Sequence, residues 1–330
     1  MRIAILYNFD FAHLPEGVER RSQDAILGVR AAVEAALCAR GAQVRSIPVS
    51  SAPDDFVPEL LAERPELVVN LCESFAGDAR GEMLVPGLLD LTGLAYTGSG
   101  PLALTLALHK DKAKALLRGC GVTTPDSVLI ERLPDLERAS VALPAIVKPA
   151  REDASIGIDR HSVVRDESEL RRVCERVLRE HRQPALVEQY IEGRELNVAM
   201  LGNPPRPLPI SEIDFTHLDP ALPRIVTYAA KWDESSPESL ATPPVWCSLP
   251  EEIERRVFQA AVAAFTALDC RDYGRVDIRL SPEGVPFVIE VNPNCDLSPG
   301  AGFARAAEAF GLGYEDLVWR LVEVARERGP

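Results

Sequence analysis

The strongest constraint on the fold is the alternation of apolar and polar residues between 273 and 292, in the segment YGRVDIRLSPEGVPFVIEVN. This pattern predicts the two strands of a β-hairpin, closed by a turn at 281–284. Residues two apart in a strand face the same side of the sheet. The residues predicted to face a core are Val276, Ile278, Leu280, Phe287, Ile289 and Val291. The residues predicted on the opposite face are Arg275, Asp277, Arg279, Glu290 and Asn292.

The polar face of this hairpin has the composition of a site for a hard cation. Asp277, Glu290 and Asn292 offer carboxylate and amide oxygens, with no sulfur or imidazole nearby in the segment. Such ligands suit Mg²⁺, which keeps several waters and binds largely through substrate phosphates. A solvated polar face on an amphipathic hairpin is the alternative that the segment alone leaves open.

Composition limits the class of protein. The 330 residues, 46% of them hydrophobic, are enough for two or three packed units. No apolar run reaches the length of a membrane span, and the start MRIAILYNFD resembles a first strand rather than a signal peptide, so we expect a cytoplasmic protein. Seven cysteines without a CxxC pair argue against a disulfide framework or a structural zinc site. The net charge of -14 disfavours nucleic-acid and membrane partners.

Lysine is rare in this chain, which has five: Lys110, Lys112, Lys114, Lys148 and Lys231. Arginine serves ordinary surface charge equally well, so a retained lysine indicates a need for a compact ammonium, as at a phosphate oxygen. For Lys148, at the end of the apolar strand AIVKPA, this interpretation is favoured. For Lys110 and Lys114, on a predicted helix, chance retention is favoured instead.

The order of predicted elements gives an α/β and α+β chain of several units. Residues 1–95 alternate strand and helix, as in a parallel α/β domain. Residues 96–120 form a linking helix, and 121–195 form a small lid-like α+β domain. Residues 196–330 hold further strands, among them RIVTYAAKW at 224–232, then a helix at 251–268, the hairpin and a helical C-terminus.

The common phosphate-binding motifs are absent from the sequence, including GxxxxGK[ST] and GxGxxG. In their place, KPAREDASIG offers Lys148 and a polar loop in which the amides of Ser155 and Gly157 could close over a triphosphate. In VEQYIEGRELNVAML, Glu188 and Glu195 have a spacing that would suit an adenine amino group and a ribose hydroxyl, with surface carboxylates as the alternative.

Taken in order, seven blocks between residues 60 and 320 resemble the ATP-grasp superfamily, and within it the D-alanine-D-alanine ligases. They are GLAYTGSGPLALTLALHKDKAKALL, IVKPAREDASIG, VEQYIEGRELNVAML, LPISEI, AAKW, GRVDIRL and FVIEVNPN. The resemblance implies a three-domain ATP-grasp fold with ATP held between two small antiparallel sheets. It also implies two Mg²⁺ ions, which Mn²⁺ could replace, and ligation of a carboxylate and an amine through an acyl phosphate.

The resemblance also assigns residues. Those implied to contact phosphate are Lys112 in the DK pair, Lys148 and Lys231, and those implied for the loop over the triphosphate are Ser155 and Gly157. Glu188 is implied at the adenine, Glu195 at the ribose, and Gln189, Tyr190 and Ile191 in the hinge strand. The implied metal ligands are Asp277, Glu290 and Asn292, and the implied catalytic residues are Arg275, Lys148 and Lys231.

Departures from the family cluster at the substrate end. NLCESFAGDARGE stands in place of HGxxGEDG, Ala154 in place of a serine, and Trp232 in place of a tyrosine. The closing segment is replaced by NPNCDLSPGAGFARAA, in which Asp296 would repel a carboxylate and attract an ammonium. The candidate substrate residues are Glu19, Asp296, Ser298 and Gly300.

These departures favour a peptide-bond-forming ligase with altered amino-acid substrates. The alternatives are an authentic D-alanine-D-alanine ligase, a nucleotide-binding regulator without chemistry, and a phosphotransferase. The expected partners are a small carboxylate and a small amine, and a homodimer is expected from the relatives.

Overall fold

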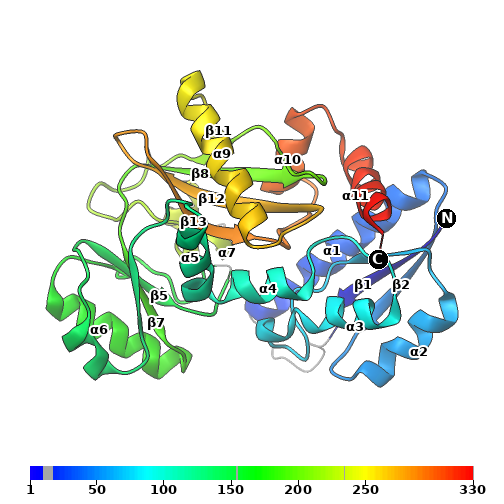
Figure 1. The fold of residues 1–330 in the computed structure, drawn as a ribbon, viewed down its shortest axis with the longest axis horizontal. Helices are drawn as coiled ribbons and strands as arrows, with labels where there is room; N and C mark the ends of the chain where they lie inside the picture. Colours follow the sequence, from blue (N-terminus) through cyan, green and yellow to red (C-terminus); the bar gives the residue numbers. More distant parts are fainter. Residues whose placement is uncertain (10–17, 154, 234, 330) are drawn as a thin grey trace.

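The structure is a computed structural model, which describes residues 1–9, 18–153, 155–233 and 235–329, with side chains from residue 26 onward in the first helix. The strands and helices form three sheets with helices around them (Figure 1). This α/β architecture with two antiparallel sheets confirms the predicted fold class.

The N-terminal sheet is parallel, in the order β2-β1-β3, and its strands are β1 (Arg2–Asn8), β2 (Gln43–Val49) and β3 (Leu67–Asn70). Alternate residues of β1 enter two different cores. Ile3 and Ile5 pack with α1 (Val18–Ala39) and with α11 (Tyr314–Arg328), whereas Leu6 packs with α2 (Pro53–Glu63) and α3 (Leu84–Thr92). Burial on both faces is typical of parallel sheets. The C-terminal helix α11 therefore completes the core of the first unit (Figure 1).

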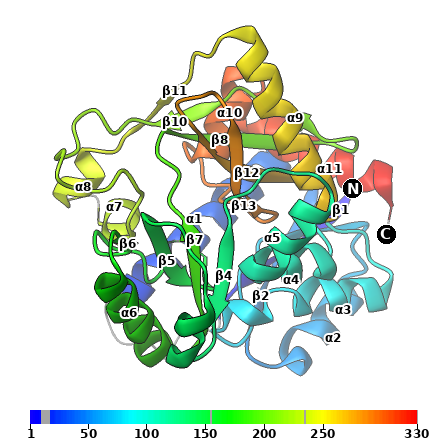
Figure 2. The ribbon, with the colours of Figure 1, turned by 60° about the vertical axis from the view of Figure 1, so that its left-hand side comes forward.

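The middle sheet is antiparallel, in the order β4-β7-β5-β6. Its strands are β4 (Ser127–Ile130), β5 (Ala145–Pro149), β6 (Val163–Val164) and β7 (Ala185–Gln189). Helix α6 (Glu167–Arg176) packs on one face through Val173 and Cys174 and continues into a π-helical turn at Val177–His181. In Figure 2 this sheet stands beside the larger C-terminal sheet.

The C-terminal sheet has the order β11-β10-β8-β12-β13, and β9 (Arg206–Pro207) pairs with the C-terminal end of β8. The other strands are β8 (Arg194–Leu201), β10 (Ser211–Ile213), β11 (Pro244–Trp246), β12 (Tyr273–Leu280) and β13 (Pro286–Asn292). Helices α9 (Glu251–Ala267) and α5 (Lys110–Gly119) cover one face, and α10 (Gly302–Ala309) precedes α11. The predicted hairpin is thus β12 and β13.

The register of this hairpin shifts by one residue after Asp277, because Ile289 has no partner on β12. Val276, Ile278 and Leu280 of β12 are in the core, as predicted. On β13 the bulge moves Val288 into the core instead of the predicted Phe287 and Ile289, whereas Val291 is buried as predicted. A β-bulge changes which residues face inward, and alternation in the sequence cannot show it.

Two further predictions differ from the structure. The single linking helix over 96–120 is two helices, α4 (Pro101–Leu108) and α5, because the backbone at His109 is not helical (φ -86°, ψ 79°). The segment 224–232 was predicted as a strand, but it ends in the short helix α7 (Tyr228–Trp232). Thr227 caps the start of this helix, because its side chain accepts a hydrogen bond from Ala230 N. Helix α8 (Pro237–Leu240) follows. The domain boundaries at 95, 120 and 195 stay predictions.

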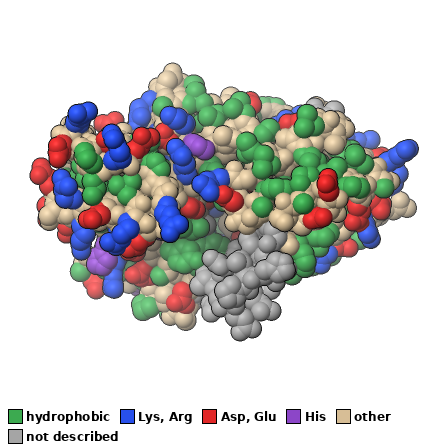
Figure 3. Space-filling view, turned by 90° about the horizontal axis from the view of Figure 1, so that it is seen from below, with side chains coloured by type: hydrophobic (Ala, Val, Ile, Leu, Met, Phe, Trp, Pro, Cys, Tyr) green, Lys and Arg blue, Asp and Glu red, His purple; other side chains and the backbone are tan. Residues whose placement is uncertain are grey.

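Charge is unevenly distributed over the surface. In Figure 3 basic side chains gather at the end of the molecule formed by the middle sheet and α6, where His161, Arg172, Arg176 and Arg179 line a shallow hollow with Glu175 and Glu180. Within the part of the chain that the structure describes, no helix is both long enough and apolar enough to cross a membrane.

Candidate active site

Lys148, near the end of β5, is buried and faces a carboxylate on the neighbouring strand. Its ammonium lies 3.1 Å from Glu188 on β7, and the Lys114 ammonium lies 3.1 Å from the same oxygen. Burial raises the pKa of Glu188, but the two ammonium groups outweigh burial and the pKa lies below its ordinary value. Glu188 therefore orients Lys148. The carboxylate that was predicted to meet an adenine amino group forms ion pairs with both lysines instead.

Helix α5 brings a different lysine to the site from the one predicted. Lys112 is 67% exposed and contacts Asp111 at 3.4 Å, whereas the Lys110 side chain is 8% exposed. Lys110 and Lys114 share a buried stripe with Ala113 and Leu117, the spacing of one helix face. Lys112 lies off that stripe, so the helix face turned toward Glu290 carries Lys110 rather than the predicted Lys112, and the phosphate contact itself stays a prediction.

The Lys110 ammonium lies between carboxylates from two units. It contacts Glu290 of β13 and lies 3.1 Å from Asp153 in the loop after β5. Burial lowers the pKa of Lys110, but Glu290 and Asp153 outweigh it and raise the pKa above its ordinary value. Burial acts oppositely on Glu290, where Lys110 and then Lys148 outweigh it and lower the pKa. Glu290 thus attracts positive charge across the cleft between the two antiparallel sheets.

Arg275 and Asp277, on the polar face of β12, form a two-pronged ion pair with distances of 2.7 and 2.8 Å. Asp277 also accepts hydrogen bonds from Asn197 Nδ2 at 2.8 Å and from Asn292 Nδ2 at 3.0 Å. Asp277 pairs with Glu290 across the hairpin. The structure therefore brings together Arg275 and the three predicted metal ligands on one face of the C-terminal sheet.

Lys231 enters the cleft from α7. Its side chain is exposed to the cleft, and its ammonium stands 5.6 Å from the centre of the Trp232 ring. Desolvation by the cleft walls and then the charge of Arg275 lower the pKa of Lys231. The amide of Tyr228, at the start of α7, donates to Ile158 O at 2.9 Å, which joins this helix to the loop after β5.

The loop after β5, which was predicted to cover a triphosphate, has a left-handed backbone at two residues. Ser155 has φ 60° and Gly157 has φ 75°. A Cβ at Gly157 would lie 2.6 Å from Pro149 Cγ and 2.8 Å from His181 Nε2, so this position has no room for a side chain. Ser155 O accepts from the amide of Ile158 at 3.0 Å.

The predicted hinge and ribose residues lie where the middle sheet joins β8. The amide of Gln189 donates to Asp126 O at 2.8 Å, and Ile191 is buried. The Arg279 guanidinium lies 2.9 Å from Glu195 and 5.8 Å from the ring centre of Tyr190. Burial, which Arg279 opposes, raises the pKa of Glu195. The predicted ribose contact is thus a half-buried carboxylate that lies against Arg279.

Asp277, Glu290 and Asn292 fit a Mg²⁺ site by their chemistry, because they supply oxygen ligands alone and the two carboxylates each bind a cationic side chain. Among the described residues, no three His, Cys, Asp or Glu side chains gather around one point as a metal site would need. The set that fits Mg²⁺ by its chemistry therefore consists of two carboxylates and one amide, and their role as ligands stays a prediction.

The substrate end of the cleft starts at the carboxyl end of the parallel sheet. Asn8 accepts from Glu73 N at 2.7 Å and donates to Ser74 O at 2.9 Å, which fixes the turn after β3. Glu73 is exposed, yet desolvation by the surrounding groups and then the charge of Asp296 raise its pKa to about 7. Sequence reasoning missed Glu73, although it lies in the segment that departs from the family.

Glu82 and Asn294 form a second contact across the substrate end. Asn294 Nδ2 donates to Glu82 Oε1 at 2.7 Å and to Cys72 O at 2.9 Å, while Asn294 Oδ1 accepts from Tyr273 at 2.8 Å. Desolvation raises the pKa of Glu82 to about 8, although the bond from Asn294 opposes the shift. Asn294 thus joins β13 to the first unit.

The predicted substrate residues of the closing segment are held by one another. Asp296 Oδ1 accepts from Ser298 N at 2.8 Å and from Ser298 Oγ at 2.5 Å. Asp296 is exposed, and Gly300 has φ 84° before α10. The side chain of Glu19, the fourth predicted residue, lies outside the part of the chain that the structure describes.

Comparison with known proteins agrees with this geometry. The family described as the D-ala D-ala ligase C-terminus matches residues 122–323. The uncharacterized protein y4sG of Sinorhizobium fredii is 35% identical over 82% of this chain and 78% of its own length. The D-alanine--D-alanine ligase of Desulforudis audaxviator is 36% identical over 74% of this chain and 77% of its own. Among solved structures, the ATP complex of D-alanine--D-alanine ligase from Bacillus anthracis matches with a TM-score of 0.76 at 23% identity, over 99% of this chain and 98% of that one.

Two antiparallel sheets with converging cationic side chains and carboxylates between them define an ATP-grasp enzyme of the carbon-nitrogen ligase class. Within that class, the chain belongs to the D-alanine-D-alanine ligase family.

Proposed function

We propose that this protein uses ATP to join a small carboxylic acid to a small amine through an acyl phosphate. The observation that carries the proposal is the convergence of four cationic side chains on Glu290. Lys110 contacts it, and Lys148, Lys231 and Arg275 lie within electrostatic reach. Four cationic side chains from four elements meet near one carboxylate. Such an arrangement suits a bound polyphosphate, whose oxygens the cations would contact while the carboxylate binds a metal ion.

In the proposed reaction, the substrate carboxylate attacks the terminal phosphate of ATP and ADP leaves. The amine then attacks the acyl carbon, so that an amide forms and phosphate departs. Lys148, held by Glu188, and Lys110 would contact phosphate oxygens, and Arg275 would stabilise the charge that develops on the transferred group. Asp277, Glu290 and Asn292 would hold Mg²⁺, or Mn²⁺ in its place, which supplies neutralisation of the triphosphate charge when bound.

The adenine end is proposed to lie at the hinge. Backbone groups of Gln189, Tyr190 and Ile191 would contact the base, and Glu195 would accept from the ribose hydroxyls. The amides of Ser155 and Gly157 would cover the phosphates, with Lys231 closing from α7. The Glu188 side chain is proposed as a positioning group for Lys148 rather than as an adenine contact, because its carboxylate already pairs with Lys114 and Lys148.

The amino-acid substrates are proposed to differ from two D-alanines. The exposed carboxylate of Asp296 brings negative charge to the substrate end, where Ser298 Oγ already donates to it, and Glu73 and Glu82 hold protons that a cationic ligand could displace. A free carboxylate on the acceptor would be repelled there, whereas a second amino group would be attracted. Cytoplasmic location and homodimer formation stay predictions.

A phosphate-release screen tests the function. Pairs of amino acids in D and L forms, including diamino acids, are incubated with ATP and Mg²⁺, and product masses are measured. Amine-dependent phosphate release with a new amide is the expected result. Release of ADP with a stable phosphorylated product would indicate a phosphotransferase, and nucleotide binding without turnover would indicate a regulator.

The matched variant is Arg275→Met, with Arg255→Met as its control because, among the described residues, Arg255 pairs with Glu252 alone, on the exposed face of α9. Arg275→Met should abolish amide formation while ATP binding persists. Equal activity of the two variants would contradict the assignment of Arg275.

A further inference from the structure

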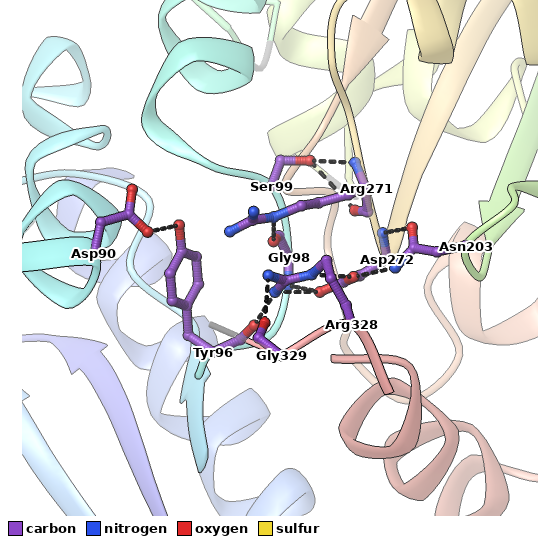
Figure 4. A network of polar contacts seen from close by, with 9 residues as sticks. All are labelled: Asp90, Tyr96, Gly98, Ser99, Asn203, Arg271, Asp272, Arg328 and Gly329. Carbon is purple, nitrogen blue, oxygen red and sulfur yellow. Dashed lines mark hydrogen bonds and ion pairs between the residues drawn. The ribbon is translucent and has the colours of Figure 1, made fainter. Parts of the chain in front are cut away.

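One buried carboxylate outside the proposed reaction joins three distant segments of the chain (Figure 4). Asp272 is fully buried, and its oxygens accept from Gly98 N at 2.9 Å, Asn203 Nδ2 at 2.6 Å and Arg328 Nε at 3.1 Å. Asn203 Oδ1 in turn accepts from the amide of Asp272 at 3.0 Å. A buried carboxylate with this many donors is a fixed point between the units that supply them.

The backbone at Asp272 shows that the carboxylate itself is what the position requires. Asp272 has φ 65°, in the left-handed region that glycine adopts without strain. A turn alone would be met best by glycine. The aspartate is therefore explained by its contacts rather than by the turn.

Both guanidinium groups beside Asp272 hold the same tyrosine of the first unit. Arg271 and Arg328 stand 5.0 and 5.6 Å from the ring centre of Tyr96, and Arg328 Nη2 donates to Tyr96 O at 2.7 Å. Arg271 Nε donates to Gly98 O at 3.2 Å. Residues 96–98 are thereby fixed to the start of β12 and to the end of α11, as Figure 4 shows.

The fixed loop leads directly to the substrate end of the cleft. The amide of Val68 donates to Ala95 O at 2.8 Å, and that of Thr97 donates to Val68 O at 2.9 Å, so the loop extends the parallel sheet. Thr97 Oγ1 accepts from Asn70 N at 3.2 Å, three residues before Glu73. On the other side, Asp272 immediately precedes β12 and lies three residues before Arg275 in the chain.

We propose that Asp272, neutralised by Arg328, is a positioning residue that sets the distance between the substrate turn after β3 and the reacting groups of β12. This proposal rests on the proposed function, because its effect is on delivery of the amine to an acyl phosphate formed at Arg275. Loss of the pair leaves ATP bound and used, but the acyl phosphate meets water more often than amine.

The first test compares Arg328→Ala with Arg320→Ala. Arg320 lies on the same helix and, within the part of the chain that the structure describes, pairs only with the surface residues Glu323 and Glu327. With the amino-acid pair selected by the phosphate screen, Arg328→Ala should lower amide formed per ADP about tenfold, the order expected for a small misplacement, while the KM for ATP stays within about twofold. Arg328→Lys should restore part of the ratio. An unchanged ratio in Arg328→Ala would overturn the proposal.

The second test replaces Asp272 by glycine and by asparagine. Glycine removes the carboxylate and suits the backbone conformation. If Asp272 served only the turn, Asp272→Gly would form as much amide per ADP as the wild type, and that result would also overturn the proposal. We expect instead that both variants uncouple as Arg328→Ala does, and that the double variant with Arg328→Ala is no worse than Asp272→Gly alone.

Hydrogen exchange separates this inference from the proposed function, because it needs no turnover. In the nucleotide-free full chain, Arg328→Ala should raise exchange in residues 66–75 and 95–99 and leave residues 185–201 unchanged, whereas Arg320→Ala should raise neither. If the wild-type chain forms no amide with any pair, the proposed function fails while this comparison still decides whether Arg328 fixes the substrate turn. Unchanged exchange in 95–99 would refute the inference.

Discussion

The two ends of the cleft hold charge in opposite ways. At the nucleotide end the buried carboxylate of Glu188 contacts Lys148, and the half-buried carboxylates of Glu290 and Asp277 contact Lys110 and Arg275. At the substrate end, carboxyl groups face amides, hydroxyls and one another. The contrast indicates that the nucleotide end is built for a polyanion whose cations are held in advance. The substrate end is suited to a ligand that carries positive charge or protons.

This contrast shows most directly in proton affinity. Lysine contacts hold the pKa values of Glu188 and Glu290 below their ordinary values despite burial. Desolvation without such contacts raises the pKa values of Glu73 and Glu82 to about 7 and about 8. Lysine contacts thus leave Glu188 and Glu290 ionised at neutral pH, whereas Glu73 and Glu82 hold protons that a cationic ligand can displace.

The largest expected effect breaks the nucleotide end. Glu290→Gln should abolish turnover, because it removes a metal ligand and the partner of Lys110, while the thermal transition persists. Amide formation at saturating Mg²⁺ is the measurement. Glu283→Gln in the exposed hairpin turn is the control, and near wild-type activity of Glu290→Gln would remove the metal assignment.

The next effect separates two lysines of the same chain. Lys148→Ala should weaken ATP binding by about 1.5–3 kcal/mol, the value of a charge-assisted hydrogen bond. Lys112→Ala should leave affinity unchanged, because that side chain is 67% exposed and contacts only Asp111. Calorimetry with ATP and Mg²⁺ measures both. Equal losses in the two variants would show that the helix face in the structure is misassigned.

A smaller effect sharpens the description of the substrate end. Asp296→Asn should shift acceptor choice from a diamino acid toward D-alanine by several-fold, because a negative charge that repels the acceptor carboxylate is lost. Competition among D-alanine, an amino-acid amide and a diamino acid measures the choice. Ser298→Ala, which removes the hydroxyl bound to Asp296, is the companion variant. Unaltered preference in Asp296→Asn, with D-alanine preferred throughout, would contradict an acidic acceptor site.

The smallest effect concerns stability and pH. The pKa of Glu82 rises from 4.5 to about 8 on folding, so the folded chain binds more protons than the unfolded chain between these values. The contribution of Glu82 is then fully present below pH 4.5 and is lost as pH rises toward 8. Glu82→Gln should flatten this part of the dependence of melting temperature on pH, and Glu66→Gln should not. A steeper fall in Glu82→Gln would reverse the sign argued here.

The sequence located features that depend on local periodicity. Alternation along 273–292 placed Asp277, Glu290 and Asn292 on one face, and the structure brings them together. The bulge at Ile289 escaped the same reasoning, because it inserts a residue without changing the alternation nearby. Periodicity also separates Lys110 from Lys112, and matching a dipeptide motif instead led to the exposed residue.

Long-range contacts were beyond the sequence. The pairing of Glu188 with Lys114 joins residues 74 apart, and the contact of Asp272 with Gly98 spans 174 positions. The helix at 228–232 depends on the cap that Thr227 provides, in a segment whose composition favours a strand. Each of these follows from tertiary neighbours that no window of sequence contains.

The pairing of lysines with carboxylates has a chemical consequence for the proposed reaction, whose intermediate is an acylating agent. An acyl phosphate reacts with any neutral amine beside it, including the protein's own. Contact with Glu290 and Asp153 keeps Lys110 protonated and unreactive, and Lys114, whose pKa is lowered to about 8, is shielded by burial behind Glu188. Lys231 combines a lowered pKa with exposure to the cleft. Of these three lysines, Lys231 is therefore the one that exposure leaves within reach of an acyl phosphate, and mass spectrometry after turnover without an acceptor would detect an acyl group there.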